Sequence, residues 1–115
     1  TAVVLVTHDL GVVAETCNRA VVMYAGSIAE EAPIENLFHH PRHPYAEGLL
    51  KSIPRIRERK LAELPTIPGS VPDLLCLPQG CRFVDRCYKA DDLCHASEPE
   101  LIWQGDQAVA CHHPN

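Results

Sequence analysis

Residues 19–31 read Arg-Ala-Val-Val-Met-Tyr-Ala-Gly-Ser-Ile-Ala-Glu-Glu, and this stretch decides the predicted fold. The apolar segment 19–24 predicts a strand, because β-branched and aromatic side chains favour extended backbone. Ala25-Gly26 predicts a tight turn, and 27–31 predicts a return strand that pairs with the first. A β-hairpin is therefore expected in the first half of the chain.

Helices are predicted on both sides of this hairpin. Asp9 is a suitable N-cap for a helix that extends to about residue 16. Beyond the hairpin, prolines open two further helices, over about 33–38 and 44–51, since proline suits the first turn of a helix. The last of these helices is expected to bury Tyr45, Leu49 and Leu50.

Residues 2–6 read Ala-Val-Val-Leu-Val, a continuous run that predicts a strand buried on both faces of a parallel sheet. His8 is then expected at the carboxyl end of that strand, which is the edge where open α/β sheets bind ligands. An imidazole there can donate a hydrogen bond to a phosphate oxygen or a water. A purely structural histidine is the alternative, because position alone does not establish a site. The chain begins with Thr1 and runs directly into this strand, so we expect it to be part of a longer chain.

The composition indicates a globular protein and excludes several classes. The 115 residues are 46% hydrophobic and 22% charged, with a net charge of −5. The apolar runs are too short for a transmembrane helix, and no secretory signal pattern is present. The acidic balance argues against nucleic-acid binding, which requires clustered Lys and Arg.

The middle of the chain is rich in proline. The spacing of its prolines excludes a long helix or a central strand and predicts an ordered but irregular strap. A flexible linker is the alternative, but the strap has several apolar anchors. The prolines are Pro54, Pro65, Pro68, Pro72 and Pro78, and the anchors are Leu64, Ile67, Val71, Leu74, Leu75 and Leu77.

Two strings, Val3 to Leu10 and Arg19 to Glu30, resemble the C-terminal part of an ABC-transporter ATP-binding subunit. The resemblance implies an α/β fold: the C-terminal end of a P-loop-type ABC ATPase core, followed by an irregular, Pro- and Cys-rich extension. It implies that His8 is the switch histidine that reaches the γ-phosphate. No G-x-x-x-x-G-K-[ST] phosphate loop occurs in these residues, so ATP and Mg²⁺ would be bound mainly by a part upstream. The chain alone is expected to be inactive.

His39, His40 and His43 lie within five residues, between Phe38 and Tyr45. A metal site is one interpretation, but the prolines favour a rigid turn that docks the next helix. The stretch 40–54, HPRHPYAEGLLKSIP, resembles the extension that marks the oligopeptide/dipeptide branch of ABC ATP-binding subunits. The matching residues are Pro41, His43, Pro44, Tyr45, Leu49, Leu50, Ser52 and Pro54.

Four cysteines, Cys81, Cys87, Cys94 and Cys111, lie within 31 residues of the acidic second half. Disulfides, a zinc site and an iron–sulfur cluster are competing interpretations, and simple packing of the thiols is a fourth. Zinc can also recruit histidine, and His95, His112 and His113 are close in sequence. Few large apolar side chains follow Gly80, which favours a metal centre that stabilises this segment.

Residues 80–111 also resemble the C-terminal cysteine motif of dipeptide and oligopeptide ATP-binding subunits, G-C-x-F-x-x-R-C-x-x-A-x-x-x-C…A-C. The resemblance implies that Cys81, Cys87, Cys94 and Cys111 ligate a 4Fe–4S cluster, which an aerobic preparation can lose or replace by zinc. Cys17 and Cys76 are outside the motif and are expected to be small buried hydrophobic residues.

The expected function is therefore that of the ATP-binding subunit of a di- or oligopeptide importer. Its implied partners are a second ATP-binding subunit, two membrane permease subunits and an extracytoplasmic peptide-binding protein, at the cytoplasmic face of a prokaryotic membrane. Residues 1–32 would end the nucleotide-binding core, and 33–115 would form the extension. The alternatives are a stand-alone metal-binding or redox module and a nickel importer of the same branch.

Overall fold

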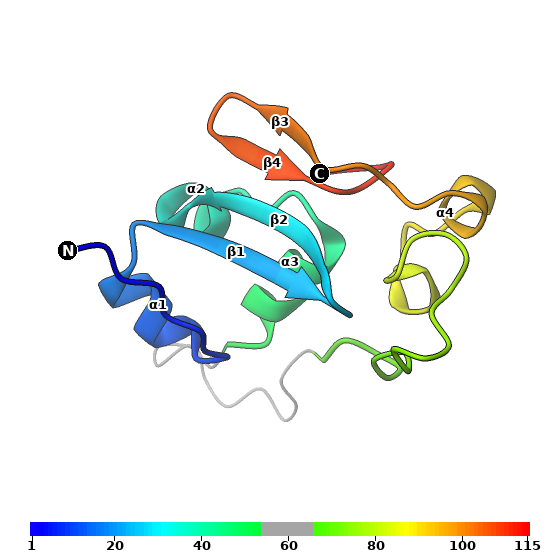
Figure 1. Ribbon diagram of the computed structural model, residues 1–115, viewed down its shortest axis with the longest axis horizontal. Helices are drawn as coiled ribbons and strands as arrows, with labels where there is room; N and C mark the ends of the chain where they lie inside the picture. The colour runs from blue at the N-terminus through cyan, green and yellow to red at the C-terminus, as the bar shows by residue number, and fades with distance from the viewer. Residues whose placement is uncertain (54–65) are drawn as a thin grey trace.

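The computed structural model describes residues 1–53 and 66–115. A four-stranded antiparallel sheet lies beside short helices (Figure 1). Residues 80–96, which contain Cys81, Cys87 and Cys94 and are called the cysteine segment below, lie at one end of the molecule. In chain order the elements are α1 (Leu10–Thr16), β1 (Arg19–Tyr24), β2 (Ser27–Pro33), α2 (Ile34–His39), α3 (Pro44–Lys51), η1 (Val84–Arg86), α4 (Asp92–Ala96), β3 (Ile102–Gln104) and β4 (Gln107–Val109). Within these ranges no helix has the length and apolarity needed to cross a membrane.

The predicted hairpin is confirmed. β1 and β2 pair antiparallel, with Tyr24 opposite Ser27 across the two-residue turn. Ala25 and Gly26 both have positive φ, 47° and 80°, which is the geometry of a type I′ turn. This turn matches the twist of the flanking strands and therefore fixes their register.

A second hairpin, which the sequence analysis did not predict, completes the sheet. β3 and β4 are joined by Gly105-Asp106, and Gly105 has a φ of 63°. β4 then pairs with β2, with Glu30 opposite Val109, so the strand order is β1-β2-β4-β3. The last strands of the chain are thereby attached to the N-terminal hairpin.

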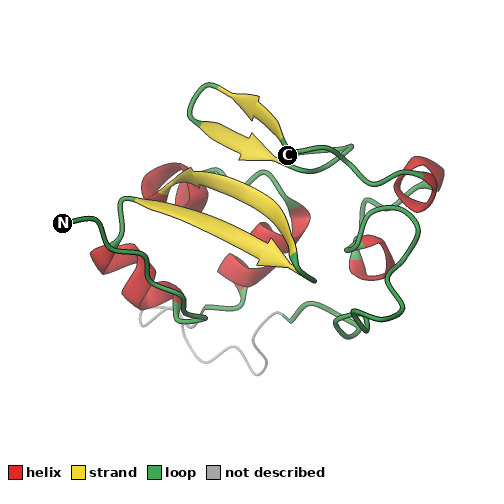
Figure 2. Ribbon diagram, viewed as in Figure 1, coloured by secondary structure: helices red, strands yellow, loops and turns green. Residues whose placement is uncertain are grey.

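The three predicted helices are confirmed, with ends within one or two residues of the expectation. Asp9 caps α1, because its Oδ1 accepts the Val12 amide at 3.2 Å. α2 and α3 pack behind β1 and β2 (Figure 2). The core between them and the hairpin contains Val22, Tyr24, Ala29, Ala32, Leu37, Ala46 and Phe83, with Tyr45 and Leu49 packed against it.

The predicted strand over residues 2–6 is wrong. This segment has no regular structure, and Val4 and Val6 are more than 90% exposed. A strand needs a neighbour that accepts its backbone hydrogen bonds, and no described strand pairs with these residues. The described sheet is accordingly antiparallel throughout, and not the parallel sheet that the sequence predicted.

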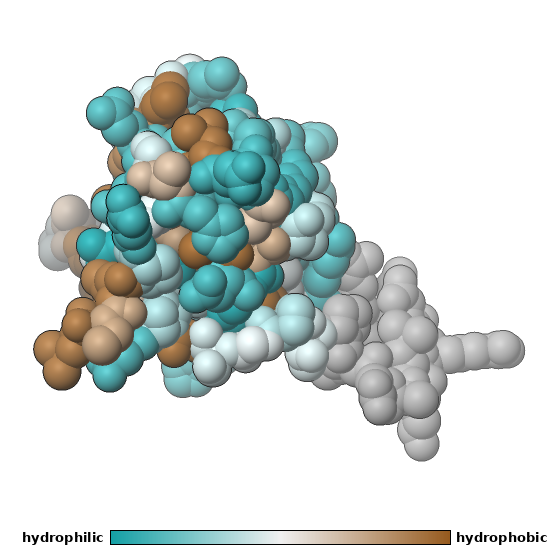
Figure 3. Space-filling view, turned by 90° about the vertical axis from the view of Figure 1, so that its right-hand side faces the viewer, coloured by the Kyte–Doolittle hydropathy of each residue, from teal (hydrophilic) through white to brown (hydrophobic). Residues whose placement is uncertain are grey.

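The proline-rich strap is described only from residue 66 onward, so Leu64 lies outside the described residues. Residues 66–79 contain no helix or strand. Ile67 packs against the core as expected, whereas Val71, Leu74 and Leu75 are exposed, so these three anchors were wrongly predicted. The face on the side of the cysteine segment is largely hydrophilic, with apolar patches that are separate from one another (Figure 3).

Candidate metal centre

The fold brings together four cysteines from separate segments. Cys81 precedes η1, Cys87 follows it, Cys94 lies in α4, and Cys111 follows β4. Burial raises the pKa of the Cys81 thiol, and the charges of Cys111, Cys94 and Cys87 raise it further. Charge repulsion of this kind requires proximity, so the four sulfurs form one group. All six cysteines are free thiols.

Backbone groups hydrogen-bond all four of these sulfurs. The amide of Lys89 donates to Cys87 Sγ at 3.4 Å, and that of His113 donates to Cys111 Sγ at 3.3 Å. The Phe83 backbone makes the same contact with Cys81, and the Asp91 backbone with Cys94. For Cys81, Cys87 and Cys111 the donor is two residues after the cysteine. Burial raises the pKa of the Cys87 and Cys111 thiols overall, whereas these hydrogen bonds and the charge of Lys89 act in the opposite direction and favour the thiolate form that binds metals.

Gly80 allows two of the cysteine segments to approach closely. The amide of Cys81 donates to the carbonyl of Cys94 at 2.8 Å. A Cβ at position 80 would lie 2.1 Å from that same carbonyl oxygen. Glycine is therefore required here, and this accounts physically for the Gly-Cys pair that begins the motif.

The sulfurs are spaced too widely for a single zinc ion. In a tetrahedral site with four thiolates, the sulfurs lie about 3.8 Å apart. Among the described residues, the one trio of potential ligand atoms that converges within 4.8 Å consists of Asp91, Cys94 and His113, and it contains a single sulfur. Four partly buried thiols at wider spacing fit a multi-atom inorganic core that takes thiolate ligands.

Asp91 is the residue that the sequence analysis missed. It caps α4 by accepting the Cys94 amide at 3.0 Å, and its other oxygen lies 2.7 Å from His113 Nε2. These hydrogen bonds, led by the one from the Cys94 amide, lower its pKa to about 2. The local signal was an aspartate three residues before a cysteine at a helix start, but only the fold brings His113 to it.

Cys17 and Cys76 lie outside the group. Cys17 is half-buried at the end of α1, where its amide bonds the Val13 carbonyl. Cys76 is exposed in a turn closed by its own amide and the Asp73 carbonyl. The expectation that Cys76 is buried was wrong, because no layer of the described structure covers this turn.

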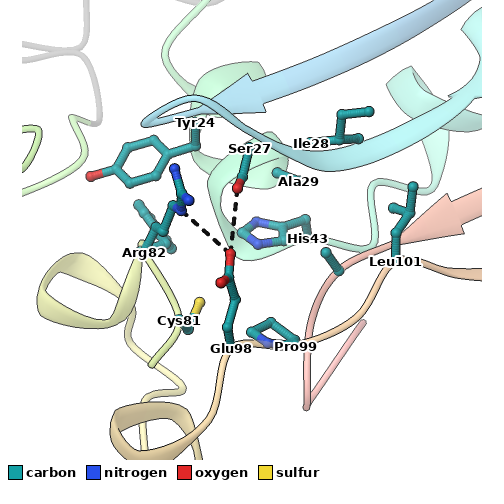
Figure 4. Close-up of a pocket in the computed structure, with 12 residues that line it drawn as sticks. Tyr24, Ser27, Ile28, Ala29, His43, Cys81, Arg82, Glu98, Pro99 and Leu101 are labelled. Atoms are coloured by element: carbon teal, nitrogen blue, oxygen red, sulfur yellow. Dashed lines mark hydrogen bonds and ion pairs between the residues drawn. The ribbon is translucent and has the colours of Figure 1, made fainter. Parts of the chain in front are cut away.

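A pocket of about 280 Å³ separates the cysteine segment from the first hairpin. Arg82 and Glu98 pair across it at 3.3 Å, and Ser27 donates to Glu98 at 3.4 Å (Figure 4). Arg82 also donates to the carbonyl of Ala25 in the hairpin turn. The residue after Cys81 therefore connects the four-cysteine group to the sheet.

His43 forms the other wall of this pocket and has a structural role. It is 3% exposed, its Nδ1 accepts the Tyr45 amide at 3.0 Å, and it begins α3. Burial lowers its pKa to about 4, against a hydrogen bond with the Ala110 backbone that raises it. His39 and His40 are exposed. The helix after this turn packs against the core through Tyr45 and Leu49, as the interpretation of a docking turn predicted, although these two residues and Leu50 are half-buried and Pro44 and Ala46 are the side chains that α3 buries.

Glu30 attaches the histidine–proline turn to the sheet. Its carboxylate is fully buried and accepts the amides of Arg42 at 3.0 Å and His43 at 2.9 Å. Gln107 Nε2, from β4, donates to the same group at 2.6 Å. A buried carboxylate is tolerated here because it receives three hydrogen bonds.

His8 lies exposed in a bend directly before α1. The expected buried strand before it is absent from the described structure, so its position at a strand end was wrongly predicted. His8 precedes α1, and α1 lies at the opposite end of the molecule from α4, the helix that contains Cys94 (Figure 1).

Comparison with known proteins assigns the family. Residues 29–94 match the family model described as the C-terminal region of oligopeptide/dipeptide transporters. A peptide import ATP-binding protein of Brucella melitensis is 51% identical over 113 residues, which cover 94% of this chain and 32% of the relative. The oligopeptide transport ATP-binding protein AppD of Bacillus subtilis is 50% identical over 102 residues, which cover 89% of this chain and 31% of the relative.

A peptide ABC transporter ATP-binding protein of Sinorhizobium fredii is 47% identical over 116 residues, covering 100% of this chain and 35% of the relative. The chain thus spans about a third of the length of the curated relatives it matches. The family match includes the buried Glu30, the turn before α3 and the first three cysteines of the group. The chain therefore belongs to the family of the C-terminal region of oligopeptide/dipeptide transporters.

Proposed function

We propose that this chain is the C-terminal portion of the ATP-binding subunit of an ABC importer for di- or oligopeptides. The observation that carries the proposal is the family match over residues 29–94, together with relatives that are named as ATP-binding proteins of peptide transport. The proposed partners are a second ATP-binding subunit, two membrane permease subunits and an extracytoplasmic peptide-binding protein. The subunit would act at the cytoplasmic face of a prokaryotic membrane.

In this proposal residues 1–32 end the nucleotide-binding core, and 33–115 form the extension. His8 hydrogen-bonds the γ-phosphate and orients the attacking water, while residues outside this chain hold most of the ATP and the Mg²⁺. The exposed bend leaves His8 free to meet a nucleotide held by another part of the subunit. Without a phosphate loop, the chain alone should not hydrolyse ATP.

The role of His8 is tested in the complete subunit by His8→Ala. ATP turnover should fall by more than about tenfold, because a donor to the transferred phosphoryl group is lost, whereas nucleotide binding should persist. His39→Ala is the matched control, since His39 is also exposed and should leave turnover unchanged. Unchanged turnover in His8→Ala would contradict the switch role.

We further propose that Cys81, Cys87, Cys94 and Cys111 hold a 4Fe–4S cluster. The support is the gathering of four thiols, the backbone donors to them and a spacing wider than a single zinc ion requires. When bound, such a cluster supplies a rigid cross-link and a capacity for one-electron transfer. The chain contributes the thiolates, and Lys89 offsets their negative charge.

This proposal is tested on protein prepared without oxygen. We expect brown protein with iron and acid-labile sulfide and a visible absorption that bleaches on reduction. Cys87→Ser should abolish the iron and the colour, whereas Cys76→Ser, at an exposed cysteine outside the group, should keep both. Colourless protein with one zinc per chain would overturn the proposal.

A further inference from the structure

Three side chains with different donor atoms converge at the edge of the cysteine group. Asp91, Cys94 and His113 each offer one ligand atom, and these atoms lie within 4.8 Å of one another. Asp91 is the N-cap of α4 and Cys94 lies in its first turn, whereas His113 comes from the segment after β4. The set therefore combines one oxygen, one sulfur and one nitrogen from two separate parts of the chain.

We propose that Asp91, Cys94 and His113 form a mononuclear site for a divalent first-row metal ion of the Zn²⁺ type. Carboxylate, thiolate and imidazole are the three ligand types that zinc takes in proteins, and three protein ligands leave the fourth position for water. Nothing in the proposed transport function requires this site.

The distances are close to those of a coordinated ion. Asp91 Oδ2 lies 2.7 Å from His113 Nε2. Two ligand atoms that each lie about 2.0 Å from a tetrahedral zinc are about 3.3 Å apart, so the pair needs to open by roughly 0.6 Å. The side chains of His113 and Asp91 are 39% and 48% exposed, which permits this adjustment and gives an ion access from solvent.

Hydrogen bonds to the backbone of the ligand-bearing segments hold the three ligands in place. Lys89 Nζ donates to the carbonyl of His113 at 3.1 Å, and the amide of His113 bonds Cys111 Sγ. Cys94 is buried in α4, whose first turn Asp91 caps. Ion binding then requires changes in side-chain torsions alone, so the conformational entropy lost on binding is small.

The site shares Cys94 with the four-cysteine group. The competition that follows between the ion and the cluster rests on the proposed cluster. The ion and the cluster compete for the Cys94 thiolate, so we expect an ion at Asp91, Cys94 and His113 to disfavour the cluster, and the cluster to disfavour the ion.

Cobalt(II) is the probe for this site, because it replaces zinc and its thiolate bonds absorb in the near ultraviolet. Protein free of metal and with reduced thiols should bind one Co²⁺ per chain, with the absorption of a single Co²⁺–thiolate bond. Asp91→Asn, which keeps the helix cap, and His113→Gln should each weaken binding more than about 100-fold, since even outer-shell partners of a metal ligand are worth 10–100-fold. Asp92→Asn and Cys87→Ser are the controls and should bind normally.

Each outcome of the Co²⁺ binding experiment supports or overturns the proposed site. Absence of binding, or binding that Asp91→Asn and His113→Gln leave unchanged, would overturn the proposal. Equal loss in Cys87→Ser, with absorption from several thiolates, would assign the ion to the four cysteines instead. In protein loaded with iron and sulfide, Co²⁺ uptake should fall, and full uptake would overturn the competition alone. Failure to load the cluster contradicts the cluster proposal and leaves the result on cluster-free protein intact.

Discussion

At the scale of single residues, His43 shows how burial turns a motif residue into a source of pH dependence. Burial lowers its pKa from 6.5 to about 4. The unfolded chain therefore takes up a proton near pH 6.5, while the folded protein takes it up only near pH 4. Stability is greatest above pH 6.5 and falls as the pH decreases from 6.5 to 4, by about 3 kcal/mol in total.

This pH dependence can be measured by urea unfolding at intervals between pH 7 and 4.5. In His43→Asn the asparagine can still cap α3 but has no proton to take up, so its stability should be lower at pH 7 and change less over this range. The carboxylates whose pKa is lowered, Glu47 and Asp91, begin to contribute only below about pH 4.5. An identical slope in the wild type and in His43→Asn would contradict the assignment to His43.

At the scale of elements, the sequence predicted the helices and the turn that are stabilised by contacts within a few residues. The caps of α1 and α3 and the Ala25-Gly26 turn lie within a few residues of the elements they fix, and these elements were predicted with nearly correct ends. The Gly105-Asp106 turn carried a similar signal between β3 and β4, but their three-residue strands are too short to show a clear alternation. Residues 2–6 failed for the opposite reason, because a strong strand pattern forms no strand without a partner.

The candidate metal-binding residues also divide into those that local sequence identifies and those that only the fold brings together. The four cysteines were identified from the spacing of a family motif, whereas nothing local to Cys94 indicates that His113 lies beside it. Glu30 is a similar case. It lies in the hairpin that the sequence predicted, but its three hydrogen-bond donors come from residues 42, 43 and 107. Contacts between distant residues could not be deduced from one sequence.

At the scale of the whole molecule, several contacts join the N-terminal hairpin to the cysteine segment and the end of the chain, and two of them differ clearly in burial. One is the β2–β4 pairing, with the Glu30 carboxylate beneath it. The other is Arg82, which pairs with Glu98 and donates to the hairpin turn. Glu30 is the stronger of the two, because it is fully buried, whereas the Arg82–Glu98 pair is partly exposed and weakened by solvent.

Replacing Glu30 should therefore loosen the molecule as a whole. Glu30→Ala leaves the amides of Arg42 and His43 without an acceptor and removes one of the two acceptors of Gln107 Nε2, which also donates to the His40 carbonyl. Each lost partner costs about 1–3 kcal/mol. We expect the free energy of unfolding to fall by about 3 kcal/mol or more, with faster hydrogen exchange in β4 as well as in the turn before α3. Glu31→Ala is the matched control, since within the described residues Glu31 forms a partly exposed ion pair with Arg19, and its loss should cost less than about 1 kcal/mol. If the two variants unfold alike, or if exchange in β4 does not change, the two ends of the chain are held together by something other than this carboxylate.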